Sequence, residues 1–248
     1  MLIALLMLVC SSSVYAAIWR PSATTTFQWQ LDSGHINTHV DAHVYDVDLF
    51  EVSTSTIHSL QSSGKKVICY FSAGSYEGWR SDHSAFPSDV IGHKLDIRDG
   101  RVKSIMSARL KKAQDKGCDG VEPDNVDGYT NDNGFHLTAH DQLTFNKWLA
   151  TEAHNHGLSV GLKNDVDQIQ ELQSHFDWAL NEECVNYNEC KKYQPFIDAH
   201  KAVFHVEYVD SHSSGSSKKS SVCHSSRRPQ QFITLIKDWD LTDWRLTC

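Results

Sequence analysis

The residues with the clearest chemical potential stand together in residues 117–129, which read Gly-Cys-Asp-Gly-Val-Glu-Pro-Asp-Asn-Val-Asp-Gly-Tyr. Side chains alternate between the two faces of a strand, so Glu122 and Asp124 share one face near the end of a short strand. Asn125 and Asp127 follow in the expected loop. Carboxylates crowded at one strand end repel each other and lower stability unless something binds there. The stretch therefore indicates a site, with a solvated acidic turn as the alternative.

Acidic residues also stand at the ends of other expected strands. Together these positions are Asp46, Asp48, Glu77, Glu122, Asp124, Asp127, Glu182 and Glu207, with Lys163 as the single cation. Two carboxyl groups beside one glycosidic bond can hydrolyse it, because one protonates the leaving oxygen while the other attacks or activates water. Crowding separates their pKa values, so one stays protonated near neutral pH. Aromatic residues near this face could stack on sugars or belong to the core: Trp29, Tyr70, Trp79 and Tyr129.

Short apolar segments alternate with amphipathic ones along the chain. We expect strands over 27–31, 42–50, 66–72, 94–98, the acidic stretch after Gly117, 159–164, 176–182 and 201–208. Helices are expected over 56–63, 101–116 and 138–156. Strand–helix alternation predicts a parallel sheet, and about eight strands indicate a closed α/β (β/α)8 TIM barrel, whose sites form at the strand carboxyl ends. A doubly wound open sheet is the alternative, although its Gly-rich phosphate turn is absent.

The two ends of the chain carry separate expectations. Residues 1–17 contain no Asp, Glu, Lys or Arg, and an apolar run leads to a small-x-small pattern at Val14-Tyr15-Ala16, which is typical of a signal peptide. We therefore expect a secreted, extracellular protein with one domain over 18–248. The Ser-rich segment 211–228 predicts a flexible loop. Pro229 should begin a last helical piece, and 241–248 should dock onto the barrel.

The cysteine count supports secretion. Seven Cys become six once Cys10 leaves with the signal peptide, and an even number in a secreted chain favours disulfides. Six Cys allow fifteen pairings. The pairing we expect joins Cys184 to Cys190, Cys223 to Cys248 and Cys69 to Cys118. A zinc site needs a tight Cys/His cluster, which the sequence lacks, so we expect no metal.

Charge and motifs exclude other function classes. The net charge of −8 argues against nucleic acid, which needs a basic face, and suits a cationic or neutral partner. There is no G-x-S-x-G nucleophile motif and no phosphate loop. Most of the fifteen His fall in expected loops or helices, where a solvated or structural role is the simpler interpretation.

Six ordered blocks carry a resemblance to a known family. They are Trp-Gln-Leu at 29–31, Tyr-Asp-Val-Asp-Leu-Phe at 45–50, Val-Ile-Cys-Tyr-Phe-Ser-Ala-Gly-Ser-Tyr-Glu at 67–77, the stretch 117–129, Gly-Leu-Ser-Val-Gly-Leu-Lys-Asn at 157–164 and Ala-Leu-Asn-Glu-Glu-Cys at 179–184. Together they resemble the endo-α-1,4-polygalactosaminidase family of glycoside hydrolases. The resemblance implies a secreted barrel enzyme that cuts α-1,4-linked galactosamine polysaccharide, of the galactosaminogalactan type, internally and without a metal or other cofactor.

The resemblance also implies roles for individual residues. Asp124 and Glu182 match the two catalytic carboxylates, with Glu182 as the acid and Asp124 as the nucleophile or base. The residues expected to bind the sugar are Asp46, Asp48, Tyr70, Glu77, Glu122, Asn125, Asp127, Tyr129, Lys163, Asn164 and Glu207. Deacetylated galactosamine carries an ammonium, so an acidic cleft complements its charge. We expect a monomer that binds no nucleic acid and, after signal cleavage, no membrane.

The chain departs from the family in one segment. Between 86–92 and 95–98 the family usually carries a longer, Trp-containing segment, and its loss here could open the cleft or remove a sugar subsite. Two of the acids also have a possible structural role, because Asp48 could cap a helix and Glu207 could pair with Lys163.

Three rival functions fit part of the pattern. The protein could be a sugar-binding barrel without turnover, although it keeps both catalytic carboxylates. It could be a hydrolase that acts on a different amino-sugar glycan. It could also be a metal-dependent deacetylase, which needs an Asp and two His at one site.

Overall fold

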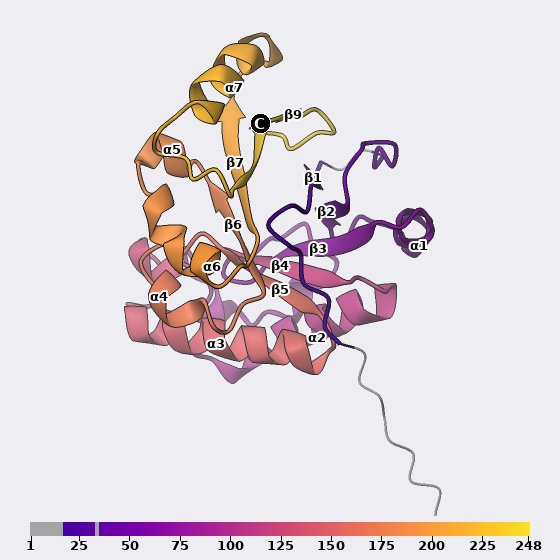
Figure 1. Ribbon diagram of the computed structural model, residues 1–248. Coiled ribbons are helices and arrows are strands. Elements are labelled where there is room, and N and C mark those ends of the chain that lie inside the picture. The colour runs from indigo at the N-terminus through magenta and orange to yellow at the C-terminus, as the bar shows by residue number, and fades with distance from the viewer. Residues whose placement is uncertain (1–16, 33–34) are drawn as a thin grey trace, which may run out of the picture.

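The computed structural model describes residues 17–32 and 35–248 and shows the expected TIM barrel (Figure 1). Eight parallel strands follow one another in chain order, and a short ninth strand pairs antiparallel with the eighth. The strands are β1 (Phe27–Gln30), β2 (Val44–Asp48), β3 (Lys66–Ser72), β4 (Gly120–Asp124), β5 (Ser159–Lys163), β6 (Trp178–Glu182), β7 (Val203–Val209), β8 (Ile233–Asp238) and β9 (Leu246–Thr247). The expected signal peptide lies outside the described residues except for its last position, 17.

Helices cover the outside of the sheet (Figure 1). The α-helices are α1 (Thr54–Ser62), α2 (Gly100–Lys116), α3 (Ala139–Asn155), α4 (Ile169–Leu172), α5 (Cys184–Tyr187), α6 (Gln194–Asp198) and α7 (Gly215–Cys223). The 3-10 helices are η1 (His83–Ala85), η2 (Ser88–Val90), η3 (Gly128–Thr130), η4 (Cys190–Tyr193) and η5 (His212–Ser214). None of the helices in the described ranges is both long and apolar enough to cross a membrane.

Local sequence explains where the long helices begin and end. The Asp99 side chain accepts a hydrogen bond from the backbone N–H of Arg101 and so caps α2. Thr138 and Asp141 form a reciprocal capping box at the start of α3. Gly117 has a left-handed φ of 84° and ends α2, which turns the chain into β4. The acidic end of β4 is thereby fixed relative to a rigid helix.

Two apolar clusters build the core. The larger one lies between the strands and helices such as α2 and α3. The smaller one brings together aromatic residues of β1, β6 and β7, among them Trp29, Trp178 and Phe204. A Cβ on Gly161 would lie 2.3 Å from the Trp178 ring, so this close packing of β5 against β6 requires glycine.

The C-terminal segment connects the last and first strands of the barrel. Leu31 donates its backbone N–H to the carbonyl of Leu241 at 3.0 Å. The Gln28 side chain donates to the carbonyl of Asp243 at 2.9 Å, and the Arg245 guanidinium donates to the carbonyl of Phe27. The expectation that 241–248 docks onto the barrel is therefore confirmed.

The three disulfides have the expected pairing. Cys69–Cys118 joins β3 to the residues before β4, and Cys184–Cys190 holds the loop after β6. Cys223–Cys248 ties the end of the chain to α7. Each bond restricts the unfolded chain and so stabilises the folded one. The second bond begins two residues after Glu182.

The expectations for two chain segments are wrong. Residues 94–98 form no strand, and Ile91 and Leu95 make only an isolated bridge in the connection between β3 and α2. The alternating apolar residues of this segment, Leu95 and Ile97, are buried although the segment is not a strand. The eighth parallel strand is β8, which replaces the helix expected after Pro229, because its Ile and Thr residues favour a strand.

The flexible loop expected over 211–228 is instead largely helical. It contains η5 and α7, although its Ser-rich sequence shows no helical periodicity. Contacts with distant residues stabilise α7 where the local sequence favours a helix only weakly. Val222 is buried, and Gly215 packs against Trp244. Cys223 adds the covalent link described above.

We predict that Gly161→Ala destabilises the barrel by about 1–3 kcal/mol, because the new methyl group overlaps the buried Trp178 ring. Thermal unfolding measures this as a lower Tm. Gly100→Ala is the matched control, since nothing lies within 4 Å of a Cβ at the start of α2. It should be neutral or stabilising by up to about 1 kcal/mol. Equal Tm values for both variants would contradict the assigned packing.

Candidate active site

Lys163, at the end of β5, lies among three carboxylates. Its Nζ lies 2.9 Å from Glu122 Oε1 and 3.5 Å from both Asp124 Oδ1 and Glu182 Oε2. The side chain is only 2% exposed. Burial alone would lower the pKa of Lys163, but the surrounding carboxylates, Asp124 first, raise it well above its usual value. Lys163 is therefore a permanent cation at the centre of the site.

This shared lysine holds the predicted catalytic carboxylates close together. Because one oxygen of Asp124 and one of Glu182 each lie 3.5 Å from Nζ, these two oxygens cannot be separated by more than twice that distance. Both side chains reach solvent, with exposed fractions of 21% and 29%. Two carboxylates from separate strands thus converge at one accessible place.

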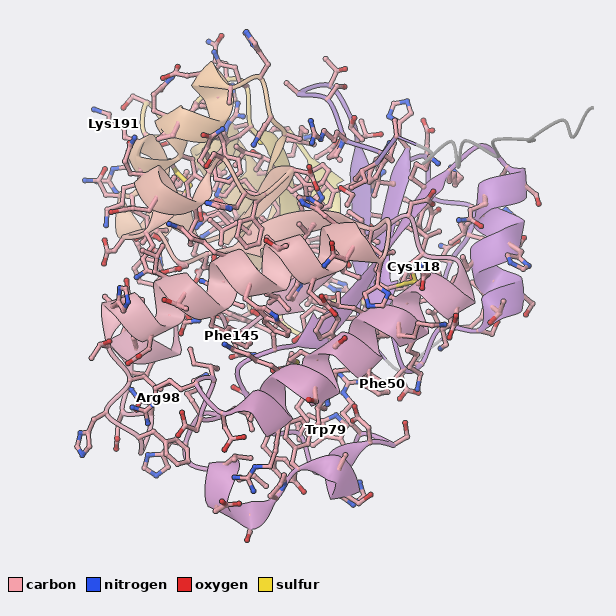
Figure 2. All side chains as sticks on the ribbon, turned by 90° about the horizontal axis from the view of Figure 1, so that it is seen from below. Phe50, Trp79, Arg98, Cys118, Phe145 and Lys191 are labelled. Carbon is pink, nitrogen blue, oxygen red and sulfur yellow. A yellow bond between two sulfur atoms is a disulfide. The ribbon has the colours of Figure 1, made fainter. Side chains whose placement is uncertain are left out.

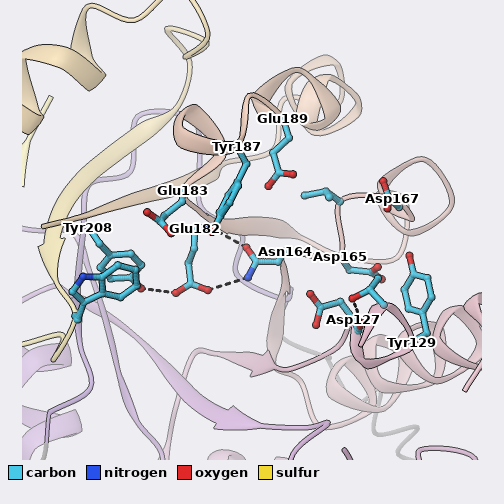
Figure 3. Close-up of a pocket in the computed structure, with 13 residues that line it drawn as sticks. Asp127, Tyr129, Asn164, Asp165, Asp167, Glu182, Glu183, Tyr187, Glu189 and Tyr208 are labelled. Atoms are coloured by element: carbon cyan, nitrogen blue, oxygen red, sulfur yellow. Dashed lines mark hydrogen bonds between the residues drawn. The ribbon is translucent and has the colours of Figure 1, made fainter. Parts of the chain in front are cut away.

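Each carboxylate is oriented by a tyrosine. Tyr70 on β3 donates its hydroxyl to Asp124 Oδ2 at 2.9 Å, while Tyr208 on β7 donates to Glu182 Oε1. Asn164 donates its side-chain amide to Glu182 Oε2 at 2.9 Å and accepts the backbone N–H of the same residue at 3.0 Å (Figure 3). These hydrogen bonds limit the rotation of both carboxyl groups.

A second pair of acids forms the floor beneath Lys163. Glu122 is fully buried and accepts the Trp29 indole N–H at 3.0 Å in addition to Lys163. Asp46 is buried beside it, and burial followed by the charge of Glu122 raises the pKa of Asp46 well above its usual value. Burial also raises the pKa of Glu122, while the Lys163 ammonium lowers it. Glu122 is therefore the buried acid that pairs directly with the lysine.

A pocket of about 380 Å³ opens beside Glu182. Its lining comes from loops after several strands and comprises Asp127, Tyr129, Thr130, Asn164, Asp165, Val166, Asp167, Glu182, Glu183, Tyr187, Glu189, Tyr208 and Trp239 (Figure 3). The lining holds six carboxyl groups and no Lys or Arg. Trp239 stacks on Tyr208 with ring centroids 4.1 Å apart. The pocket thus combines negative charge with aromatic surface, which suits a cationic sugar.

Most residues predicted for the site come together. Asp124, Glu182, Lys163, Asn164 and Tyr70 form the centre described above, with Asp46 and Glu122 beneath it. Asp127 and Tyr129 line the pocket. Asp46 and Glu122 lie in the middle of β2 and β4, and the others stand toward or beyond the carboxyl ends of β3 to β6, which is the functional face of this fold.

Three predicted sugar contacts are engaged in the loops beside the site. Asp48 and Glu77 both bind Arg80, at 2.7 Å and 2.9 Å. Asp48 also accepts the backbone N–H of Phe50, a local capping role. Asn125 accepts Lys94 Nζ at 2.9 Å and donates to a serine of β3. None of the three lines the pocket, and each stabilises a loop.

Glu207 lies away from the pocket, and the expectation that it binds sugar is not supported by its position. It is fully buried and accepts the backbone N–H of Val185 at 2.8 Å and a hydrogen bond from His205 at 3.1 Å. Lys218 of α7 lies 3.0 Å from its other oxygen. The basic partner of Glu207 is therefore Lys218, while Lys163 contacts the carboxylates of β4 and β6.

Several pocket residues lie outside the predicted set. Tyr208 ends a predicted strand, so its position could have indicated it. Trp239 follows β8, the strand that replaces the helix expected after Pro229. Asp165 and Glu189 stand in loops, and Tyr187 ends the one-turn helix α5, without a recognisable sequence pattern.

One cluster has the composition of a metal site. In the ranges that the structure describes, the single group of three converging His, Cys, Asp or Glu residues is Cys184, Cys190 and His205. Its two sulfur atoms form a disulfide. Figure 2 draws the side chains of the whole molecule and labels Cys118, which belongs to another of the three disulfides. A disulfide sulfur is not the thiolate that binds a metal.

Fold and site together define a TIM-barrel glycoside hydrolase. The model of glycoside-hydrolase family GH114 matches residues 10–248. The crystal structure of Aspergillus fumigatus Ega3 in complex with galactosamine is similar at 42% identity and a TM-score of 0.88, covering 96% of this chain and 100% of that chain. The chain therefore belongs to family GH114.

More distant structures share the fold alone. The glycoside hydrolase domain of PelA from Pseudomonas aeruginosa has 9% identity and a TM-score of 0.67, with 90% of this chain and 97% of that chain covered. The β-N-acetylhexosaminidase from Bacteroides fragilis has 9% identity and a TM-score of 0.53, with 75% and 51% covered. Comparison with curated proteins gave no match.

We predict that Lys163→Met lowers the free energy of unfolding by about 3–5 kcal/mol, because it leaves Glu122 buried without its cation. The double variant Lys163→Met with Glu122→Gln should recover part of this loss. Denaturant unfolding measures both effects. Lys111→Met, on the exposed face of α2, should change stability by less than about 0.5 kcal/mol. A Lys163→Met protein as stable as the parent would contradict the assigned charge balance.

Proposed function

We propose that this glycoside hydrolase cleaves α-1,4-linked galactosamine polysaccharide internally, with Asp124 and Glu182 as its catalytic residues. The observation that carries the proposal is the convergence of these two solvent-accessible carboxylates on Lys163, beside a pocket lined by six carboxyl groups. Galactosamine residues are cationic when deacetylated, and the pocket lining offers negative charge without a competing Lys or Arg. The similar Ega3 crystal structure contains galactosamine.

The two carboxylates can divide the chemistry between them. Glu182, which lines the pocket, gives its proton to the glycosidic oxygen as the bond to the anomeric carbon breaks. Asp124 accepts hydrogen bonds from the Tyr70 hydroxyl and the backbone N–H of Asn125, which orient its carboxylate to bond the anomeric carbon. In the second step Glu182 removes a proton from water, whose oxygen displaces Asp124. Lys163 keeps the two side chains at either side of the linkage.

The proposed setting for this reaction is outside the cell. Three disulfides among the described residues support an oxidising compartment, in which such bonds persist. The enzyme would encounter the galactosamine polysaccharide outside the cell. We therefore propose secretion together with this substrate.

Loss of either catalytic carboxylate should abolish most activity. We predict that Asp124→Asn and Glu182→Gln each reduce turnover by about 10²-fold or more, the usual scale for acid–base residues. The measurement is the release of reducing ends from partly deacetylated galactosaminogalactan. Asp115→Asn, which makes the same chemical change on an exposed residue of α2, is the control and should keep full activity. Near-normal turnover in both site variants, with unchanged Tm, would rule out the assignment.

The geometry also predicts the stereochemical outcome. Retaining enzymes hold their carboxyl groups about 5–5.5 Å apart, and inverting enzymes about 6.5–9.5 Å apart. Lys163 keeps one oxygen of Asp124 and one of Glu182 within twice 3.5 Å of each other, which favours the shorter, retaining separation. We therefore expect retention, so that proton NMR of the fresh reaction detects the α-anomer of the new reducing end first. Initial formation of the β-anomer would show that Asp124 activates water instead.

A further inference from the structure

One wall of the pocket is built from a short stretch of chain, residues 183–190, which we call the wall segment. It contributes three side chains to the pocket lining, those of Glu183, Tyr187 and Glu189 (Figure 3). The segment follows β6 directly and contains α5, a helix of a single turn. Glu183 and Asn188, on either side of α5, both have a left-handed φ, of 61° and 58°. A helix this short is not stable alone, so the wall segment needs contacts from elsewhere in the chain.

Glu207 on β7 supplies the acceptor that α5 lacks. The first N–H groups of a helix find no acceptor inside the helix, and the Glu183 side chain does not cap this one. Instead, Glu207 Oε1 accepts the backbone N–H of Val185 at 2.8 Å and that of Asn186 at 3.3 Å. A fully buried carboxylate of another strand therefore fixes the start of α5.

Two neighbours keep Glu207 charged and in place. His205, two residues earlier on the same face of β7, lies 3.1 Å from Oε1, and its other ring nitrogen lies 3.1 Å from Thr234 Oγ1. Lys218 of α7 lies 3.0 Å from Oε2. Burial alone would raise the pKa of Glu207, but His205, followed by Lys218, lowers it below its usual value. Glu207 is therefore an ionised acceptor at neutral pH.

Glu182 is held by a separate set of contacts. Its hydrogen bonds go to Asn164 and Tyr208, and none of these bonds involves Glu207 or the wall segment. The disulfide within the wall segment joins the segment to itself and does not attach it to the barrel. Loss of the Glu207 carboxylate should therefore release the pocket wall while it leaves Glu182 in position.

We propose that Glu207 is a positioning residue that holds the wall segment in place, so that its Tyr187 and Glu189 side chains can contact a bound sugar. This inference rests on the proposed function of the pocket. Tyr187 is 66% exposed, so its position depends on the backbone that carries it more than on packing of its ring. Strand β7 then has two roles, because Tyr208 orients Glu182 while Glu207 fixes the wall beside it.

The division between wall and catalytic end predicts how the kinetic constants separate. Glu207→Gln keeps the side-chain volume but removes the charge that His205 and Lys218 face. We expect KM for galactosamine oligosaccharides to rise about tenfold, the scale of one lost charged hydrogen bond, while kcat changes by less than about twofold. Lys218→Met, which alters a partly exposed side chain, should raise KM in the same direction and supplies the test should Glu207→Gln not fold. An unchanged KM in the folded variants overturns the positioning role.

Asp177→Asn is the matched control. Asp177 is also a buried acid that accepts a backbone N–H, from Val160 at 3.0 Å, and contacts a histidine, His154, at 2.9 Å. It precedes β6, at the end of the strand opposite Glu182. Its loss should lower Tm and leave KM unchanged. An equal rise of KM in Asp177→Asn and Glu207→Gln would show that Glu207 acts through global stability alone, which overturns the proposal.

Amide hydrogen exchange, followed by NMR, tests the positioning without a substrate. In the parent protein we expect the amides of Val185 and Asn186 to exchange at least about 10-fold more slowly than in an unstructured chain. Glu207→Gln should remove this protection and leave the amide of Glu182 protected. Unprotected amides in the parent, or equal exchange in parent and variant, overturn the inference while leaving hydrolysis by Asp124 and Glu182 untouched. A parent that cleaves no galactosamine polymer, but shows protection that depends on Glu207, refutes the proposed function and supports the anchoring of the wall segment.

Discussion

The site depends on one buried cation. Lys163 contacts three carboxylates that come from β4 and β6, and the attraction of Glu122 keeps its ammonium below the surface. A buried lysine without these anions would lose its proton, and the carboxylates without the lysine would repel one another. The charge balance therefore sets the position of the two carboxylates proposed to react. Buried Asp46 and the tyrosines Tyr70 and Tyr208 complete this arrangement.

The barrel makes this balance possible, because parallel strands bring residues far apart in the chain to one edge. Asp124 and Glu182 are separated by two βα units, and β5 with Lys163 lies between their strands. In the same topology, acids outside the site form ion pairs that stabilise the fold. Glu207 neutralises Lys218 behind the sheet, and Arg80 holds Asp48 and Glu77 in the loops beside the site. The acids proposed to be catalytic and the structural acids thus occupy different places on one barrel.

Much of this could be predicted from the sequence. The strand alternation in 120–124 correctly placed Glu122 and Asp124 on one face, and the cysteine spacing predicted all three disulfides. The orientation of Glu207 was harder to predict, because β7 is buried on both faces. Its sequence pattern does not show which side chains face the inside of the barrel. The position of Asp165 at the pocket could not be predicted, because it depends on a left-handed backbone turn that no local sequence pattern indicates. The helix α7 depends on contacts with distant residues such as Trp244.

A crystal structure of the Glu182→Gln variant with a bound galactosamine oligosaccharide tests the central claim most directly. We predict one glycosidic oxygen within hydrogen-bonding distance of the substituted side chain, with the anomeric carbon of that linkage facing Asp124 and Lys163 between the two side chains. An oligosaccharide that binds elsewhere on the barrel, or with Asp124 and residue 182 on the same side of the linkage, would contradict it.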